Sequence, residues 1–263
     1  MLTAEEKTAI ISLIHRQVVP AIGCTEPIAV ALCVAKAREL LGSLPESIDI
    51  RLSANILKNA MGVGIPGTGM TGLPIAVALG ALIGRPELEL EVLQDCNREA
   101  VERGKRYIAE GRIRISLEEN APDKLYIAVT VAADGQDAEA RIATEHANFV
   151  YLRRGGDVIE DKPIHAGHAD EEEEVELTLR KVYEFATETD VDDLHFILQA
   201  RDMNEAAAAD GLRENFGHQL GKTLCSPLGR GIMGEGIFSK VLSATSCACD
   251  ARMAGAMIPV MSN

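Results

Sequence analysis

The pattern of hydrophobic and polar residues predicts helices in the first part of the chain. Apolar residues recur at helical spacing in four segments, which cover residues 4–19, 27–41, 73–83 and 87–110. Thr3 is a suitable N-cap for the first helix, and Pro20 stops it. Gly42 ends the second, because glycine adopts the left-handed conformation that is common at that position. One strand is expected over residues 48–53, where apolar and polar side chains alternate.

From residue 112 onward the spacing changes from that of helices to that of strands. We expect strands over residues 112–117, 125–132, 138–144 and 149–152. Asp134 and Gly135 form a suitable hairpin turn between the middle two. A polar loop is expected over 153–170, and helices are expected over 172–188, 190–208 and 250–256. The predicted fold class is α+β, with helical segments flanking an inserted, mainly antiparallel sheet.

The same change of pattern divides the chain into three predicted regions. They are an N-terminal helical region with one strand (1–110), an inserted β-rich α+β subdomain (111–188) and a helical return segment (189–263). The chain ends in an apolar stretch, 257–263, without a charged terminus. We interpret that ending as a truncation of the last region.

Composition and charge argue against several classes of partner. Hydrophobic residues make up 47% of the chain and charged residues 25%, as in globular proteins. The formal charge of −14 repels phosphate backbones and anionic membranes, so we expect no nucleic-acid and no membrane partner. No stretch reaches the roughly 18 consecutive apolar residues of a membrane span, and the first residues contain no signal-peptide core. We predict a cytoplasmic protein with reduced cysteines.

Cys24 is the candidate catalytic residue. The stretch 23–27, Gly-Cys-Thr-Glu-Pro, places its thiol between two predicted helices. Unpaired N–H groups at the start of the second helix would favour the thiolate and lower the pKa of Cys24. A thiolate there can act as a nucleophile, a metal ligand or a proton acceptor. A buried, inert cysteine is the competing interpretation.

Two other stretches are candidates for binding a small anion. The Gly-rich stretch 61–72 matches neither the Walker A motif nor the glycine fingerprint of dinucleotide-binding proteins. Its backbone N–H groups, beside a helix start, would nevertheless suit a carboxylate. A close-packed turn, in which only glycine fits, is the alternative. Asn55 and Lys58 follow the first strand, where Lys58 could hold a carboxylate or simply lie on the surface. His146 is the histidine best placed for a pocket, although a structural role is equally compatible.

Several of these stretches, taken together, resemble the L-cysteine desulfidase family, which is related to the iron–sulfur serine dehydratases. The matching stretches, in chain order, are GCTEP (23–27), SANILKN (53–59), GVGIPGTGM (62–70), DARM (250–253) and PVMSN (259–263). The resemblance runs from about residue 4 to the last residue. It implies the N-terminal portion of an oxygen-sensitive [4Fe-4S] lyase that converts L-cysteine to sulfide, ammonia and pyruvate.

The resemblance also implies roles for individual residues. Cys24 matches the cysteine proposed to accept the α-proton of the substrate. The expected substrate-binding residues, all within the matching stretches, are Glu26, Asn55, Lys58, Thr68, Ser262 and Asn263. In the family, the three cluster cysteines lie in a C-terminal region beyond this chain. We therefore expect no metal ligands and no bound cluster in this chain by itself.

The resulting prediction is an incomplete and inactive portion of a lyase with a small amino-acid substrate. A homo-oligomer or a missing C-terminal half would complete it. L-serine dehydratase of the same superfamily is an alternative, since iron can equally assist the loss of hydroxide. A third alternative, from another class, is a non-catalytic module that binds a small anion or an amino acid.

Overall fold

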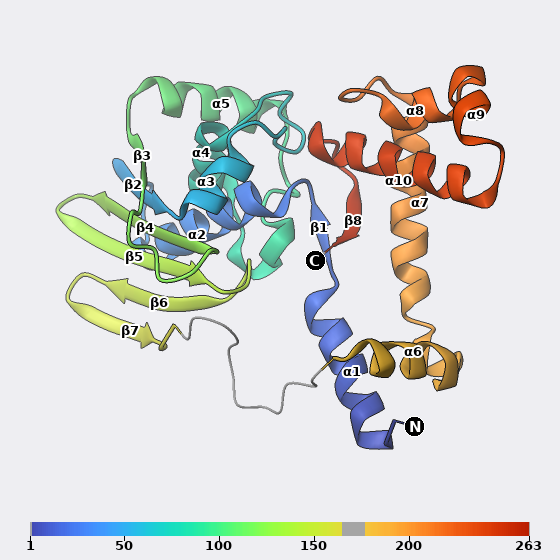
Figure 1. Cartoon of the computed structure of the whole chain (residues 1–263). Coiled ribbons are helices and arrows are strands. Elements are labelled where there is room, and N and C mark those ends of the chain that lie inside the picture. Colours follow the sequence, from blue (N-terminus) through green and yellow to red (C-terminus); the bar gives the residue numbers. More distant parts are fainter. Residues whose placement is uncertain (1, 165–176, 263) are drawn as a thin grey trace.

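Helices flank a mainly antiparallel sheet in this chain, as the hydrophobic pattern predicts (Figure 1). The computed structural model describes residues 2–164 and 177–262. The helices within those ranges are α1 (Ala4–Gln17), α2 (Thr25–Leu41), α3 (Ala54–Ala60), α4 (Leu73–Ile83), η1 (Pro86–Glu91), α5 (Arg98–Ala109), α6 (Leu179–Glu188), η2 (Asp192–Leu194), α7 (Ile197–Arg213), α8 (Leu220–Cys225), α9 (Pro227–Met233) and α10 (Ile237–Met253). The strands are β1 (Val19–Ile22), β2 (Ser47–Leu52), β3 (Ile113–Leu117), β4 (Tyr126–Ala133), β5 (Gln136–Ala143), β6 (Phe149–Arg154), β7 (Asp157–Asp161) and β8 (Pro259–Ser262).

The main sheet has six strands in the order β3-β2-β4-β5-β6-β7. β2 and β3 run parallel, and the other neighbouring pairs are antiparallel. Asp134 and Gly135 have positive φ values of 51° and 73° and form the predicted turn between β4 and β5. β2 belongs to the predicted N-terminal region, yet it lies between strands of the predicted β-rich subdomain. The division into three regions itself stays a prediction.

The core lies between the sheet and two apolar helices, α2 and α4. Every residue from Ile28 to Ala35 of α2 is buried, because this helix packs on β4 and β5 on one side and on α4 on the other. Gly80 permits the close approach of α4, since a Cβ there would lie 2.5 Å from the carbonyl oxygen of Ala31. Small aliphatic side chains thus fill a core in a chain that is only 3% aromatic.

Three helix predictions in the N-terminal region are wrong in their boundaries. The helix predicted over 4–19 ends at Gln17, because Val19 and Pro20 belong to the strand β1. The predicted helix over 87–110 consists of η1 and α5, because Glu89 has a φ of 47° and Asn97 starts α5 by accepting a hydrogen bond from the Ala100 N–H. The helix predicted from Pro27 begins at Thr25, with Cys24 as its N-cap. The αL conformation of Gly42 ends that helix, as predicted.

The region after residue 153 contains more regular structure than the predicted loop. β7 forms there and pairs with β6, while residues 165–170 of that loop lie outside the described residues. The helix predicted over 172–188 is described from 177 onward, where Thr178 caps α6. The helix predicted over 190–208 is interrupted, because η2 precedes an α7 that extends to Arg213.

The C-terminal region of the chain packs as helices and ends in a strand. α10 packs on α7 and α8, and its end includes much of the helix predicted over 250–256. The apolar stretch after it forms β8, which pairs antiparallel with β1 (Figure 1). None of the described helices is long and apolar enough to cross a membrane.

Candidate functional site

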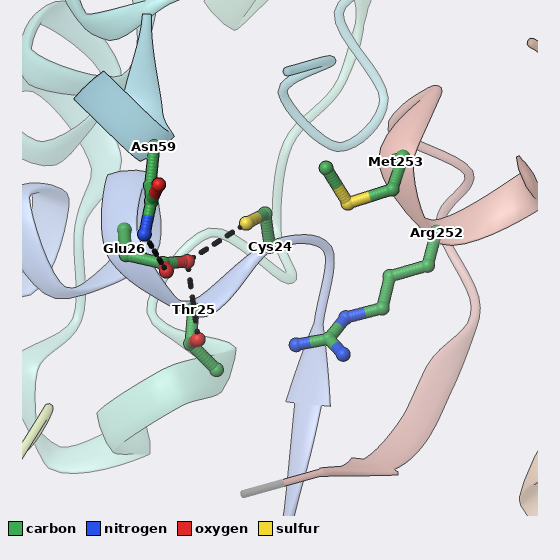
Figure 2. A pocket seen from close by; sticks show the side chains of 6 residues that line it. All are labelled: Cys24, Thr25, Glu26, Asn59, Arg252 and Met253. Carbon is green, nitrogen blue, oxygen red and sulfur yellow. Dashed lines mark hydrogen bonds between the residues drawn. The ribbon is translucent and has the colours of Figure 1, made fainter. Parts of the chain in front are cut away.

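A pocket of about 340 Å³ lies where the β1–α2 connector meets the end of α10 (Figure 2). Its lining comes from three segments of the chain that are distant in sequence: the start of α2, the end of α3 and the end of α10. The lining residues are Cys24, Thr25, Glu26, Asn59, Arg252 and Met253.

Gly23 sets the position of the Cys24 thiol. Its φ of +83° turns the chain from β1 into α2, a conformation that glycine adopts without strain. A Cβ at this position would lie 2.5 Å from Cγ of Pro66, so the connector touches the Gly-rich turn. Cys24 follows this contact directly and lines the pocket, while its catalytic role stays a prediction.

The Cys24 thiol donates a hydrogen bond of 2.9 Å to Oε2 of Glu26. Burial first, and then this hydrogen bond and the charge of Glu26, raise the pKa of Cys24 from 9.0 to about 12. The expectation that the helix start lowers this pKa is wrong, because Cys24 is only 7% exposed and faces a carboxylate. At neutral pH the side chain is a thiol that donates a hydrogen bond to Glu26.

Glu26 is the ionised partner of this pair. Burial by itself raises the pKa of Glu26, but hydrogen bonds from Cys24, its own backbone and Asn59 outweigh burial and lower the pKa below 4.5. Nδ2 of Asn59 donates to Oε1 at 3.1 Å, and the Thr25 hydroxyl donates to Oε2 at 3.4 Å. Both carboxylate oxygens are thus fixed, and the expected participation of Glu26 in the pocket is consistent with this geometry.

Arg252 brings a positive charge to the opposite wall of the pocket. Its Nε donates a hydrogen bond of 2.8 Å to the carbonyl oxygen of Gly23. Figure 2 shows the side chain extending from α10 toward the Cys24–Glu26 pair. Its charge acts on Cys24, whose pKa it lowers slightly against the larger effects of burial and Glu26. With Nε fixed, the two terminal nitrogens form a fork suited to a carboxylate.

His146 lies close enough to the pocket to interact electrostatically with Glu26 and Arg252. Burial, followed by the charge of Arg252, lowers its pKa below 6.5, although Glu26 acts in the opposite direction. The imidazole is therefore neutral at pH 7. This partly buried histidine is a neighbour of the site and does not line the pocket.

The Gly-rich turn 61–72 uses its amides to hold the turn against α10. The N–H groups of Gly64 and Gly67 donate to the carbonyl oxygens of Met253 and Gly255, at 2.8 and 3.1 Å. Other amides of the turn bond within it; these are the N–H groups of Ile65, Thr68, Met70 and Gly72. The interpretation as a close-packed turn is therefore supported over the interpretation as an anion-binding loop.

Several predicted binding residues do not lie in the pocket. Asn55 and Lys58 are exposed on α3 and do not line it. The Thr68 hydroxyl bonds within the Gly-rich turn, to Ile65 and Met70. The backbone of Ser262 pairs with Val19, which places it in the β1–β8 sheet. Asn263 lies outside the described residues.

Two important residues were missed by the sequence prediction, although both lie in the stretches that carry the resemblance. Asn59 follows buried Ile56 by three positions on α3, so the helical spacing places it at the edge of the buried face. That spacing was an available signal. Arg252 had no local signal, because its partner Gly23 lies 229 residues earlier in the chain.

The pocket does not fit an iron–sulfur cluster, which requires several thiolate ligands. Cys24 is its single cysteine, and that thiol is protonated and bonded to a carboxylate. Across residues 2–164 and 177–262, no three His, Cys, Asp or Glu side chains gather as a metal site. The chemistry proposed for this pocket is therefore assigned to the side chains that line it.

Comparisons with known proteins return relatives that match nearly the whole chain. A UPF0597 protein of Bacteroides fragilis is 58% identical over 262 residues, which cover 100% of this chain and 61% of the relative. A UPF0597 protein of Bacteroides thetaiotaomicron is 59% identical over 258 residues, covering 98% of this chain and 60% of the relative. A UPF0597 protein of Oleidesulfovibrio alaskensis is 43% identical over 254 residues, covering 96% and 59%. The chain spans about three fifths of the length of these relatives.

These comparisons correct the resemblance drawn from short motifs. No family model matches the chain, and no solved structure matches it. Motifs such as GVGIPGTGM are short, and here one of the glycines, Gly64, is explained by close packing on the backbone of Ala254 at the end of α10, without any catalytic role. The assignment to the L-cysteine desulfidase family is wrong, because the relatives that match this chain over nearly its whole length are named UPF0597 protein.

Proposed function

We propose that the pocket binds a small amino acid and that the protein, in a longer form, is a lyase that releases sulfide from L-cysteine. One observation carries the proposal. A thiol and an ionised carboxylate share a hydrogen bond of 2.9 Å on one wall, and a guanidinium faces them from the other. Such a set combines a proton acceptor, a thiol that holds it in position and an anchor for an anion.

Binding would depend on Arg252. Its terminal nitrogens can hold the α-carboxylate of an amino acid with two parallel hydrogen bonds. The bond from Nε to Gly23 holds the guanidinium in one orientation before the ligand arrives. A pocket of about 340 Å³ suits a small substrate.

The protonation states of Cys24 and Glu26 would decide which of them accepts a proton from the substrate. The Glu26 carboxylate takes the α-proton, and the electrons of that C–H bond form the carbon–carbon double bond. The bond to the β-sulfur breaks, and the sulfur leaves as hydrosulfide, which takes up the proton that Glu26 has accepted. Cys24 holds the Glu26 carboxylate in position through their hydrogen bond. The aminoacrylate product takes up water and becomes pyruvate and ammonia.

This assignment differs from the expected role of Cys24 as the proton acceptor. A thiol with a pKa of about 12 is predominantly protonated at neutral pH, whereas Glu26 is ionised. The participation of a [4Fe-4S] cluster stays a proposal for a longer form only. Its ligands would have to come from a segment outside this chain.

A non-catalytic amino-acid-binding module is the second candidate. The raised pKa of Cys24 favours it, because a protonated thiol is a poor nucleophile and a poor base. In that case, Arg252 would still anchor a carboxylate, and the Cys24–Glu26 pair would only shape the pocket.

The test measures binding and turnover separately, under anaerobic conditions. Calorimetry gives the affinity of this chain for L-cysteine and L-serine. Sulfide and pyruvate release are then measured for the chain co-expressed with the remainder of the Bacteroides fragilis relative. Cys24→Ala and Glu26→Gln are the test variants, and Cys249→Ala, at an exposed cysteine, is the control.

The outcomes separate the candidates. Sulfide and pyruvate release that both test variants lose and Cys249→Ala keeps would support the lyase. Pyruvate from L-serine without sulfide from L-cysteine would support the dehydratase alternative. Amino-acid binding without any product would support the binding module, and the absence of both binding and turnover would overturn the proposal.

A further inference from the structure

Helix α10 buries its small side chains and exposes its large apolar ones. The buried positions, four residues apart, are Ser239, Ser243, Cys247 and Ala251. In contrast, Ile237 is 82% exposed, Phe238 is 68% exposed and Val241 is 56% exposed. An amphipathic helix on the surface of a globular protein has the opposite arrangement.

Close packing fixes this orientation of α10. A Cβ at Gly211 of α7 would lie 2.1 Å from the carbonyl oxygen of Cys247, and one at Gly221 of α8 would lie 2.2 Å from its Sγ. The Ser243 hydroxyl also donates to the carbonyl oxygen of Gly221 at 2.7 Å. Because only small residues fit at these crossings, α10 cannot rotate to bury Phe238.

Helix α9, the helix that precedes α10, also exposes large apolar side chains. It is joined to α10 by three residues, and the Ser239 hydroxyl donates to the carbonyl oxygens of Met233 and Gly234 at 3.0 and 2.8 Å. On α9, Leu228 is 68% exposed and Ile232 is 73% exposed. We use the name outer face for the following five side chains: Leu228, Ile232, Ile237, Phe238 and Val241.

Apolar side chains that are exposed in this way to water are stabilised when another protein segment covers them. Contiguous apolar patches on folded proteins mark interfaces, and permanent interfaces are the more apolar ones. The relatives supply a candidate, because they match nearly the whole of this chain and extend well beyond the match. About two fifths of each relative lies outside the matched region.

We propose that the outer face is an intramolecular interface, covered by the segment that the longer relatives have and this chain lacks. The exposed apolar residues of the main sheet differ. Val158 and Ile159, for example, lie on the strand β7 and not on a helix with a buried stripe of small residues. This inference is independent of the pocket chemistry. A failed activity assay would leave it unchanged.

The test uses side-chain footprinting of the full 263-residue chain, by itself and co-expressed with the remainder of the Bacteroides fragilis relative. Hydroxyl radicals modify accessible side chains, so the yield at Ile237 and Phe238 reports coverage directly. Val158 and Ile159 of β7, which are 54% and 58% exposed, serve as the internal reference. We expect co-purification and at least a fivefold lower yield at the outer face, with no change on β7.

Variants provide the second measurement. Phe238→Asp is expected to reduce co-purification at least tenfold, whereas Val158→Asp leaves it unchanged. Both positions are exposed, so circular dichroism should show a folded chain for each.

Two results would overturn the proposal. One is a soluble remainder that does not co-purify with the chain. The other is protection of Phe238 in the chain by itself that increases with concentration, which would identify a second copy as the occupant.

Discussion

Nε of Arg252 donates a hydrogen bond of 2.8 Å to the carbonyl oxygen of Gly23, across 229 positions of sequence. Gly23 immediately precedes Cys24, so this bond holds the end of α10 against the connector that carries the thiol. The pocket therefore exists only when the N-terminal connector and the last helix have met. Substitutions at this contact should therefore change both the affinity for a ligand and the stability of the fold.

Replacing Arg252 with methionine should weaken the binding of a small amino acid by roughly 10- to 100-fold. The reason is the loss of a charge-assisted pair, which contributes about 1.5–3 kcal/mol. Calorimetry with L-cysteine and L-serine measures the effect. Arg230→Met, at an exposed position on α9, is the matched control and should bind as the wild type does. Unchanged affinity in Arg252→Met would show that the guanidinium is not the anchor.

Glu26→Gln should make the Cys24 thiol more reactive. After burial, the hydrogen bond and the charge of Glu26 are the largest causes of the raised pKa of Cys24, and the substitution removes the charge. Each unit by which the pKa falls increases the thiolate fraction about tenfold at a fixed pH. Iodoacetamide alkylation followed by mass spectrometry measures the rate at pH 8 to 10. Cys249 is exposed and serves as the internal reference, whose rate should not change. Equal or slower alkylation of Cys24 would contradict the assignment of the carboxylate as its partner.

The stability of the chain should fall as the pH rises above 9. The pKa of Cys24 is about 12 in the folded chain and 9.0 as its ordinary value, so the folded state holds this proton more tightly than the unfolded state. The resulting stabilisation is complete below pH 9 and is lost as the pH rises toward 12. At pH 10 we expect the free energy of unfolding to decrease on the order of 1 kcal/mol more in the wild type than in Cys24→Ser.

Urea denaturation at pH 7, 9 and 10 provides the comparison for this prediction. The buried thiol of Cys33 also has a raised pKa, but it is present in both proteins and cancels in the difference. Parallel curves for the two proteins would mean that Cys24 does not titrate in this range.

Gly64→Ala should destabilise the contact between the Gly-rich turn and α10. A Cβ at Gly64 would lie 2.3 Å from the carbonyl carbon and oxygen of Ala254, so one of the two segments must move. Overpacking of this kind costs about 1–3 kcal/mol. Gly62→Ala is the matched control in the same turn, because no atom lies within 4 Å of the added Cβ. Urea denaturation should separate the two variants, and equal stabilities would show that the turn adapts without cost.

Periodicity and caps in the sequence determined much of the local structure. The helix over 73–83, the Gly42 end of α2 and the Asp134–Gly135 turn follow from short-range properties of the chain. Helix 87–110 was predicted wrongly, because a backbone break at Glu89 leaves the apolar spacing unchanged. The sequence also indicated Cys24, since its position before a predicted helix start is a local feature, whereas Glu26 was expected only from the resemblance.

Only the tertiary structure decided the chemistry of these residues. A helix start suggested a lowered pKa for Cys24, but burial and the facing carboxylate reversed the direction of the shift. Asn59 and Arg252 reach the pocket through packing between distant segments, whereas Asn55 and Lys58 remain at the surface. The physical reason is that helix and turn propensities act over a few residues. Burial depends on segments that folding brings together, and in this pocket Gly23 and Arg252 meet from positions 229 residues apart.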